Sequence, residues 1–300
     1  MNIFLDNVNL MSTSGPNHFG NKLKKAMENQ DHTFSFDRPF DIQLSFIQVN
    51  NRLPAIPLFQ RLDGIYFNNK FDFDSQNKNI LETYKKSKGV IFQTQFNKDL
   101  TFKYFGKHEN YSIIRNGADT GFIENIRKFR NPMTDRANKV WCCASSWRPH
   151  KRLRDNIRYF TEHSDKGDIL LVAGPVEESD KIRNSRIFYL GQLVVEDLIA
   201  VYKSSDYFIH LAWLDHCPNV VVDARACGCH IICSSSGGTR EIAGQGATII
   251  EEDQWDLSPL DLYNPPKLDF TRKVVNEFRS VNEMDKVASE YINFFNKGIR

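Results

Sequence analysis

Short apolar runs and stretches with helical spacing alternate along the first half of the chain. Apolar runs of four to seven residues bounded by turn residues are typical of buried strands, and the segments between them have the spacing of amphipathic helices. The predicted strands are 2–5, 41–47, 57–62, 89–93 and 111–115, and the predicted helices are 19–28, 79–88 and 95–105. This alternation indicates βαβ units with a parallel sheet.

The alternation pauses over residues 127–138 and then restarts. This stretch is polar, contains Pro132 and has no period, so it is predicted to be a linker. The strands predicted after it are 139–144, 169–173, 186–190, 207–210, 230–233 and, as the last strand, 247–250; the helices are 151–161, 194–204 and 219–227. Helical spacing returns from 273 to 295, at positions that include Val281.

The whole pattern predicts an α/β protein with two doubly wound, Rossmann-like domains and a cleft between them. The expected domains are 1–135 and 136–272, followed by a C-terminal helix within 273–300. In doubly wound sheets, ligands bind at the carboxyl ends of the strands.

Composition narrows the possible functions. Of 300 residues, 41% are hydrophobic and 25% charged, which is typical of globular domains. Lys and Arg exceed Asp and Glu by 39 − 37 = 2, too small an excess to favour a nucleic-acid binder. No apolar run approaches the length of a membrane span, and the start of the chain lacks the basic region of a signal peptide, so a cytoplasmic protein is expected.

Six cysteines are too few for a disulfide scaffold. A zinc site from Cys227, Cys229, Cys233 and His230 lacks the usual C-x2-C spacing, so reduced thiols and no metal are expected.

The strongest chemical signal is the segment 215–228, which follows a predicted strand and opens a predicted helix. Asp215 and Asp223 could accept hydrogen bonds from sugar and ribose hydroxyls. The amides of Asn219, Val220 and Val221 would point out of the helix N-terminus towards a phosphate or a hydroxyl. The alternative is that Asp215 caps the helix and Asp223 is a solvated acid on its face.

A second signal follows the first strand of the second half. Arg148 offers a fork for phosphate oxygens and Lys151 a point charge, ahead of a predicted helix. Two alternatives remain open. The stretch could be a solvated basic face that continues through Arg152, Arg154 and Arg158, or a nucleic-acid patch, although it lacks the interleaved aromatic residues typical of one.

Three weaker signals lie in the first half. Gly15, in the turn 14–17, would let the backbone approach a ligand closely. Asp63 ends a predicted strand and should reach the cleft, unless it is only a turn residue before Gly64. The D-x-D pair Asp72 and Asp74 lies in an Asn-rich segment and is predicted to be a surface loop.

In their order and spacing, these motifs resemble the retaining glycosyltransferases of family 4, which have the GT-B fold. Asp215 to Gly228 resembles the family's E-x7-E-A-x-A-x-G element, and 146–151 its donor-phosphate element. Asn116 to Asp119 resembles the N-G-x-D at the end of the first domain, and 187–192 the strand whose end lines the nucleotide base. The likeness extends from Gly15 to Glu241, at the end of the run 237–241.

The resemblance implies a role for each matching residue. Arg148 and Lys151 would neutralise the leaving diphosphate, and Asp215 would lie near the donor sugar. Asp223 would bind the ribose, and Asp63 would lie near the acceptor. The residues implied to bind the donor are Gly15, Ser146, Leu190, Asn219, Val220, Val221 and Asp223.

The implied activity is transfer of a sugar from a nucleotide-diphosphate sugar to a glycan, lipid-linked or protein-linked hydroxyl, without a metal or other cofactor. A peripheral membrane contact is compatible with such acceptors, and the C-terminal helix would cross back to the first domain. Two departures stand out: both family glutamates are aspartates here, and Leu62 stands where relatives often carry a histidine. A sugar-nucleotide epimerase and a non-catalytic sugar-nucleotide-binding protein are the alternatives.

Overall fold

The computed structural model describes residues 1–12, 15–34, 39–280 and 283–299, and the chain divides into two compact units. The first unit consists of Met1–Asp119, Asp256–Leu260 and Val281–Arg300, and the second of Thr120–Trp255 and Asp261–Ser280. The boundary anticipated between residues 135 and 136 falls inside the second unit.

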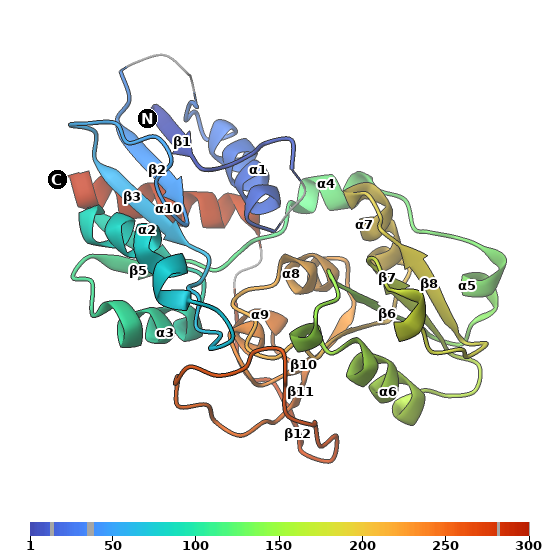
Figure 1. Cartoon of the computed structure of the whole chain (residues 1–300). Coiled ribbons are helices and arrows are strands. Elements are labelled where there is room, and N and C mark those ends of the chain that lie inside the picture. Colours follow the sequence, from blue (N-terminus) through green and yellow to red (C-terminus); the bar gives the residue numbers. More distant parts are fainter. Residues whose placement is uncertain (13–14, 35–38, 281–282, 300) are drawn as a thin grey trace. The chain divides into compact units, whose positions relative to one another are not determined.

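The first unit is built on a parallel sheet of five strands in the described part of the chain, in the order β1-β2-β3-β4-β5 (Figure 1). Strands β2, β3 and β4 are buried along their whole length, which is typical of a parallel sheet covered on both faces. The described elements are β1 (Ile3–Asp6), α1 (Gly15–Glu28), β2 (Ile42–Phe46), β3 (Leu58–Leu62), α2 (Phe73–Lys86), β4 (Gly89–Phe92), α3 (Gln95–Phe105), β5 (Tyr111–Ile113) and α10 (Met284–Ile299).

The C-terminal helix α10 packs on this first sheet, as predicted. Tyr291 and Phe295 are fully buried in one core with Phe19 of α1, and the rings of Phe295 and Phe59 of β3 lie 4.9 Å apart. Each buried aromatic side chain of this size contributes about 1.5–3 kcal/mol through the hydrophobic effect. The apolar face of α10 is therefore what returns the end of the chain to the first unit.

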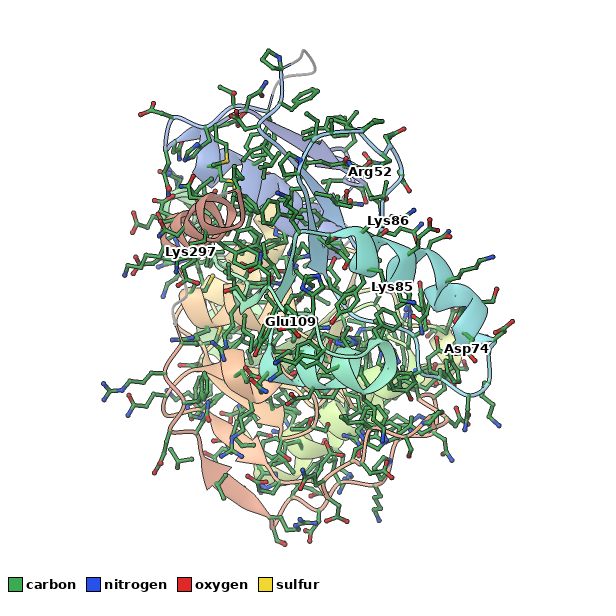
Figure 2. The ribbon with its side chains drawn as sticks, turned by 90° about the vertical axis from the view of Figure 1, so that its left-hand side faces the viewer. Arg52, Asp74, Lys85, Lys86, Glu109 and Lys297 are labelled. Carbon is green, nitrogen blue, oxygen red and sulfur yellow. The ribbon has the colours of Figure 1, made fainter. Side chains whose placement is uncertain are left out.

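Two helices of the first unit begin earlier than predicted. Helix α2 starts at Phe73 because the Asp72 carboxylate accepts a hydrogen bond from the Ser75 amide at 3.0 Å and caps the helix. Asp72 and Asp74 are exposed, as predicted, but Asp74 lies in α2 and not in a loop. Asp74 lies at the N-terminal end of α2 and Lys85 and Lys86 at the other, which suits the helix dipole (Figure 2). Helix α1 begins at Gly15, and Ser14 of the predicted turn lies outside the described residues.

The second unit has a sheet of seven described strands in the order β12-β11-β10-β9-β6-β7-β8. All neighbours are parallel except β12, which is antiparallel to β11. The described elements are α4 (Thr120–Asn125), α5 (Pro132–Arg136), β6 (Val140–Ala144), the 3₁₀ turn η1 (Pro149–Lys151), α6 (Leu153–His163), β7 (Ile169–Ala173), η2 (Glu178–Asp180), β8 (Ile187–Gly191), α7 (Val195–Lys203), β9 (Tyr207–His210), α8 (Asn219–Ala226), β10 (His230–Ser234), α9 (Thr239–Ala243), β11 (Thr248–Ile250) and β12 (Lys273–Val275).

The strand order defines where the second sheet changes direction. From β8 through β6 to β11 it is the 3-2-1-4-5-6 order of the Rossmann fold, in which β6 lies between β7 and β9. Ligands of such sheets bind outside the carboxyl ends of the strands at this switch point. The segments after β6 and β9 are therefore the expected binding segments.

Two predictions for the segments after residue 246 are wrong. Residues 273–275 are predicted to be helical but form β12, so β11 is not the last strand. Val275 pairs with Thr248 because β11 would otherwise have unpaired backbone hydrogen-bonding groups along its outer side. Helix α10 begins only at Met284, and the predicted helical position Val281 lies outside the described residues. The segment 127–138 also contains a helix, α5, which Asn131 caps.

No helix in the described parts of the chain combines the length and apolar character needed to cross a membrane.

Candidate active site

The segments after β6 and β9 bring three predicted or neighbouring polar side chains together at the switch point. Asp215 Oδ2 lies 2.5 Å from Lys151 Nζ and 3.0 Å from His210 Nε2. His210 is the last residue of β9, and Lys151 ends η1, seven residues after the end of β6. We call Lys151, His210 and Asp215 the switch-point cluster. The two residues that stood out in separate motifs, Lys151 and Asp215, are therefore direct partners.

Contacts with the neighbouring strands hold the segment after β6 in place. Trp147 Nε1 donates to the carbonyl oxygen of Ala173 at the end of β7, at 3.0 Å. The carbonyl of His150 accepts from the Trp213 amide, in the segment after β9, at 2.7 Å. Lys151 thus belongs to a turn anchored to the ends of both neighbouring strands, while Arg148 and Ser146 are exposed on the same segment.

The cluster keeps Asp215 ionised. Burial alone would raise the pKa of its carboxyl group, but the charge of Lys151 and the hydrogen bond from His210 outweigh burial and hold that pKa well below its usual range. Burial lowers the pKa of His210 although Asp215 opposes this shift, so at neutral pH the imidazole is neutral and donates one hydrogen bond. The arrangement presents a fixed carboxylate beside a cation.

Two further histidines border the cluster and make folding sensitive to acid. Burial lowers the pKa of His150 and of His216 to about 4. The unfolded value is about 6.5, so between pH 6.5 and 4 the unfolded chain binds more protons than the folded one. Stability is therefore complete above pH 6.5 and is lost as the pH falls towards 4.

We expect a loss on the order of 1–2 kcal/mol for each of these histidines between pH 7 and pH 5. Urea unfolding at the two pH values measures it. The double variant His150→Gln, His216→Gln should show a clearly smaller pH dependence than the wild type. Equal pH dependence in both proteins would contradict the assignment.

Gly237 allows the Asp215 backbone to lie against the segment after β10. The Gly238 amide donates to the Asp215 carbonyl at 2.7 Å, and a Cβ on Gly237 would lie 2.4 Å from that same oxygen. Gly237 also has a φ of +75°, which favours glycine. The run 237–241 is part of the family resemblance, but the sequence assigns no role to Gly237. In the structure, the missing side chain of Gly237 leaves space for the backbone of Asp215.

We expect Gly237→Ala to displace Asp215 and so to lower both stability and activity. The matched control is Gly246→Ala, where φ is +88° but the added Cβ would meet no atom within 4 Å. The control should lose about 1–2 kcal/mol, the cost of the backbone conformation alone. Denaturant unfolding should show a larger loss for Gly237→Ala, and equal losses would show that the close approach to Asp215 does not matter.

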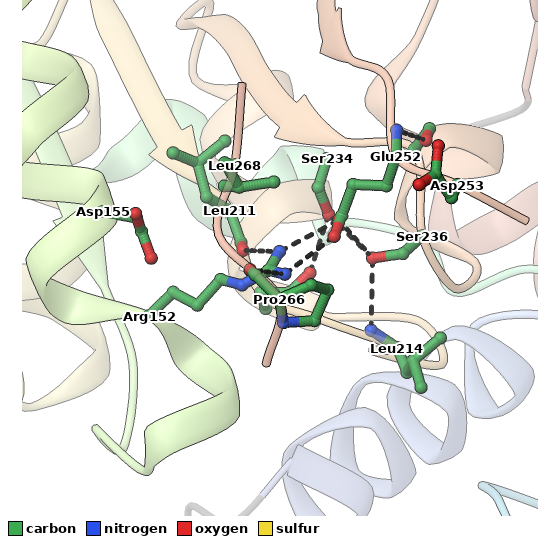
Figure 3. Close-up of polar contacts among 12 residues, drawn as sticks. Arg152, Asp155, Leu211, Leu214, Ser234, Ser236, Glu252, Asp253, Pro266 and Leu268 are labelled. Atoms are coloured by element: carbon green, nitrogen blue, oxygen red, sulfur yellow. Dashed lines mark hydrogen bonds and ion pairs between the residues drawn. The ribbon is translucent and has the colours of Figure 1, made fainter. Parts of the chain in front are cut away.

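Arg152, next to Lys151, is buried rather than part of a solvated basic face. Its guanidinium makes two hydrogen bonds to the Glu252 carboxylate, at 2.9 and 2.7 Å, and one to the Pro266 carbonyl at 2.8 Å (Figure 3). Glu252 also accepts from Ser236 Oγ at 2.7 Å, and Ser236 Oγ accepts from the Leu214 amide at 3.4 Å. This network links η1 to the residue before Asp215, and the sequence did not point to Glu252.

Helix α8 corrects part of the interpretation of the segment 215–228. Its N-cap is Pro218, so the alternative in which Asp215 caps this helix is wrong. The Val221 amide donates to the Pro218 carbonyl at 3.1 Å, so it is not free to meet a phosphate as predicted. Asp223 is buried on α8, which excludes the solvated-acid alternative.

The residues around this site are similar to a known protein family. Residues 137–258 match the family model "Glycosyl transferases group 1". The matched residues lie almost entirely in the second unit, which is therefore similar to a group 1 glycosyltransferase domain. The switch-point cluster, Arg148 and Asp223 all lie within the matched residues.

A curated protein is similar over a longer stretch than the family model. MJ1069 of Methanocaldococcus jannaschii, an uncharacterized glycosyltransferase, is 22% identical over 236 residues, which cover 70% of this chain. The chain spans 60% of the length of that relative.

Solved structures share the fold over the whole chain. Alr3699/HepE of Anabaena, solved with UDP-glucose, has a TM-score of 0.62 at 15% identity, covering 100% of this chain and 90% of its own. AviGT4, a glycosyltransferase of avilamycin A biosynthesis, has a TM-score of 0.66 at 11% identity, covering 100% and 98%. The prediction of two Rossmann-like units, as in GT-B glycosyltransferases, is confirmed.

Asp223, Leu190, Asn219 and Val220 are the other residues of the second unit that are predicted to bind the donor. Burial raises the pKa of the Tyr202 hydroxyl well above its usual range, and the nearby charge of Asp223 adds to this rise. Leu190 lies half-buried in β8, and Asn219 and Val220 open α8. Donor contacts at these positions stay predictions.

In the first unit, Asp63 has a clear structural partner. Its carboxylate accepts from Gln93 Nε2 and pairs with the fully buried guanidinium of Arg61. Arg61 also donates to Asn116 of the N-G-x-D element at 2.8 Å and to Tyr291 of α10 at 3.1 Å. Asp63 therefore balances a buried charge and is more than a turn residue, while its place near an acceptor, like the contact of Gly15 with a donor, stays a prediction.

Within the described residues, no three His, Cys, Asp or Glu side chains are grouped so that they could hold a metal ion. The six cysteines are all free thiols, and burial raises the pKa of Cys227 and of Cys233 to about 12.

Proposed function

We propose that the protein is a retaining glycosyltransferase that moves a sugar from a nucleoside-diphosphate sugar to a hydroxyl of a glycan, lipid-linked or protein-linked acceptor. The observation that carries the proposal is the Lys151–Asp215 pair at the switch point of a group 1 glycosyltransferase domain. Arg148, exposed on the same turn, supplies a second cation. HepE was solved with UDP-glucose, which makes UDP-sugars the first donors to test.

The chemistry follows from where the charges lie. When the glycosidic bond of the donor breaks, negative charge grows on the departing diphosphate. Fixed cations at that position stabilise the transition state more than the ground state, and Lys151 and Arg148 would do this in place of a metal ion. Asp215, held ionised, accepts hydrogen bonds from donor-sugar hydroxyls.

No separate base is needed in this scheme. In front-face attack, the acceptor hydroxyl enters on the side from which the diphosphate leaves, and the departing phosphate oxygen takes its proton. Leu62, fully buried at the end of β3, has no group that could serve as a base. Retention of the anomeric configuration follows from attack on the same face.

Donor binding is the first test, and it is measured by thermal unfolding with a panel of nucleotide sugars. A donor present at 100 times its dissociation constant stabilises the fold by about 2.7 kcal/mol. We expect this shift with one nucleotide sugar, unchanged by EDTA, and abolished in Asp223→Ala. The control Asp253→Ala removes an exposed carboxylate of the same unit and should keep the shift.

The product identifies the reaction. A new glycoside with the donor's anomeric configuration supports the proposal, and an inverted one contradicts retention. An epimerised nucleotide sugar would indicate an epimerase, and binding without turnover a non-catalytic binding protein. Loss of activity in EDTA that added Mg²⁺ or Mn²⁺ restores would contradict metal independence.

A further inference from the structure

A pocket in the second unit lies away from the switch-point cluster. It has a volume of about 440 Å³ and is lined by Ile126, Arg127, Lys128, Arg130 and Lys203, and we call it the basic pocket. Lys203 ends α7, and the chain then enters β9 at Tyr207, so the pocket borders the amino end of β9. The switch-point cluster follows the carboxyl ends of the strands, so the two sites lie at opposite ends of the strands of one sheet.

Lys203 builds one wall of the basic pocket. Its Nζ donates to two carbonyl oxygens of the last turn of α4, those of Ile123 at 2.9 Å and Glu124 at 3.3 Å, and to that of Ile126, just after the helix, at 2.5 Å. Carbonyls at a helix C-terminus lack partners within the helix and carry partial negative charge, which a cation offsets. Lys203 therefore fixes the end of α4 and the start of the loop that follows.

Phe129 anchors the rest of this loop to α7. Its amide donates to the Ala200 carbonyl at 3.0 Å, and its carbonyl accepts from Ser204 Oγ at 2.6 Å. Both backbone groups of Phe129 are thus satisfied by one helix end. The residues on either side, Lys128 and Arg130, extend from a fixed backbone and are exposed.

The loop cations lack the ion pairs that several other cations of this unit form. Across the described chain, no carboxylate oxygen lies within 4.0 Å of the side-chain nitrogens of Arg127, Lys128 or Arg130. Several other cations of the second unit do have carboxylate partners: Lys139 with Asp206, Arg154 with Asp180, Lys181 with Glu178 and Arg240 with Glu251. With a net charge of only +2 for the whole chain, the basic pocket concentrates uncompensated positive charge.

We propose that the basic pocket binds the phosphate group of an amphiphilic phosphate ester. Guanidinium and ammonium groups recognise phosphate oxygens through charge-assisted hydrogen bonds. Ile126 and the aliphatic stems of the Lys and Arg side chains offer apolar surface for the hydrocarbon part of the ligand. This site goes beyond the proposed glycosyl transfer and does not depend on it.

The test uses the full chain and calorimetric titration with three probes. They are dihexanoyl phosphatidic acid as a monomer, glycerol 3-phosphate, and phosphatidylcholine vesicles with or without phosphatidic acid. The pocket variant is Arg127→Gln, Lys128→Gln, Arg130→Gln. The control variant, Lys139→Gln, Arg154→Gln, Lys181→Gln, removes the same number of charges from paired positions of the same unit.

We expect the phosphatidic acid monomer to bind the wild type and the control variant with the same affinity. Its affinity for the pocket variant should be at least about tenfold lower, because each cation near an anionic group raises the binding affinity severalfold. The same loss with phosphatidic acid vesicles identifies a lipid headgroup as the source. The same loss with glycerol 3-phosphate, at equal affinity, identifies a soluble phosphate ester. Equal affinities of pocket and control variants for all probes would overturn the proposal, and unchanged thermal unfolding of both variants shows that they are folded.

Discussion

Lys151→Ala is expected to lower kcat for glycosyl transfer by about 10²–10³, or about 2.7–4 kcal/mol of transition-state stabilisation. The reason is that Lys151 Nζ is the cation fixed at the switch point, where the charge of a departing diphosphate would develop. KM for the donor should change less than kcat, because the charge that Lys151 meets grows only as the bond breaks. Steady-state kinetics with the donor found by thermal unfolding measures both constants.

The matched control for this prediction is Arg154→Ala. Arg154 lies three residues further along the chain, is 74% exposed and faces Asp180 at 3.4 Å. Its removal should leave kcat unchanged. A fall in kcat of similar size in both variants would show that general charge, rather than the position of Lys151, matters. A rise in KM alone for Lys151→Ala would place Lys151 in ground-state binding only.

Arg152→Met is expected to destabilise the second unit by about 3–5 kcal/mol. Its side chain and that of Glu252 are 1% and 6% exposed, so the substitution leaves a buried carboxylate without its partner. That loss is a large part of the 5–15 kcal/mol that holds a typical protein folded. Urea unfolding followed by fluorescence and circular dichroism measures it.

The neighbouring pair provides the control for Arg152. Arg240 meets Glu251 at 3.2 Å, with side chains that are 43% and 31% exposed. Arg240→Met should cost at most about 1 kcal/mol, since exposed ion pairs contribute little. Glu252→Gln should also destabilise more than Glu251→Gln. Similar losses at the two pairs would contradict the importance of burial.

Much of the site could be predicted because it depends on local sequence and on one rule of parallel sheets. Lys151 and Asp215 each follow a predicted strand, and strands of a parallel sheet end at the same edge. Two motifs 64 residues apart in the sequence therefore meet in the structure. The sequence does not distinguish His210, because a single histidine at a strand end has no characteristic pattern. Only its 3.0 Å contact with Asp215 places it in the site.

Other assignments required partners that are distant in sequence. In the sequence, Arg152 is one of several cations in a basic run. Only the structure shows that it is buried and paired with Glu252, which is 100 residues away. Val274 and Val275 fit a helical spacing as well as a strand, and the free edge of β11 decides for the strand.

The sequence alone determined the alternation of strands and helices, the two Rossmann-like units and the residues that follow the strand ends, because hydrophobic periodicity and turn chemistry act over a few neighbouring residues. Only the tertiary structure decided which charges are paired and buried, that Gly237 makes room for Asp215, and that the cations of the basic pocket lack carboxylate partners among the described residues. Those properties depend on distances between segments far apart in the chain, and packing sets these distances.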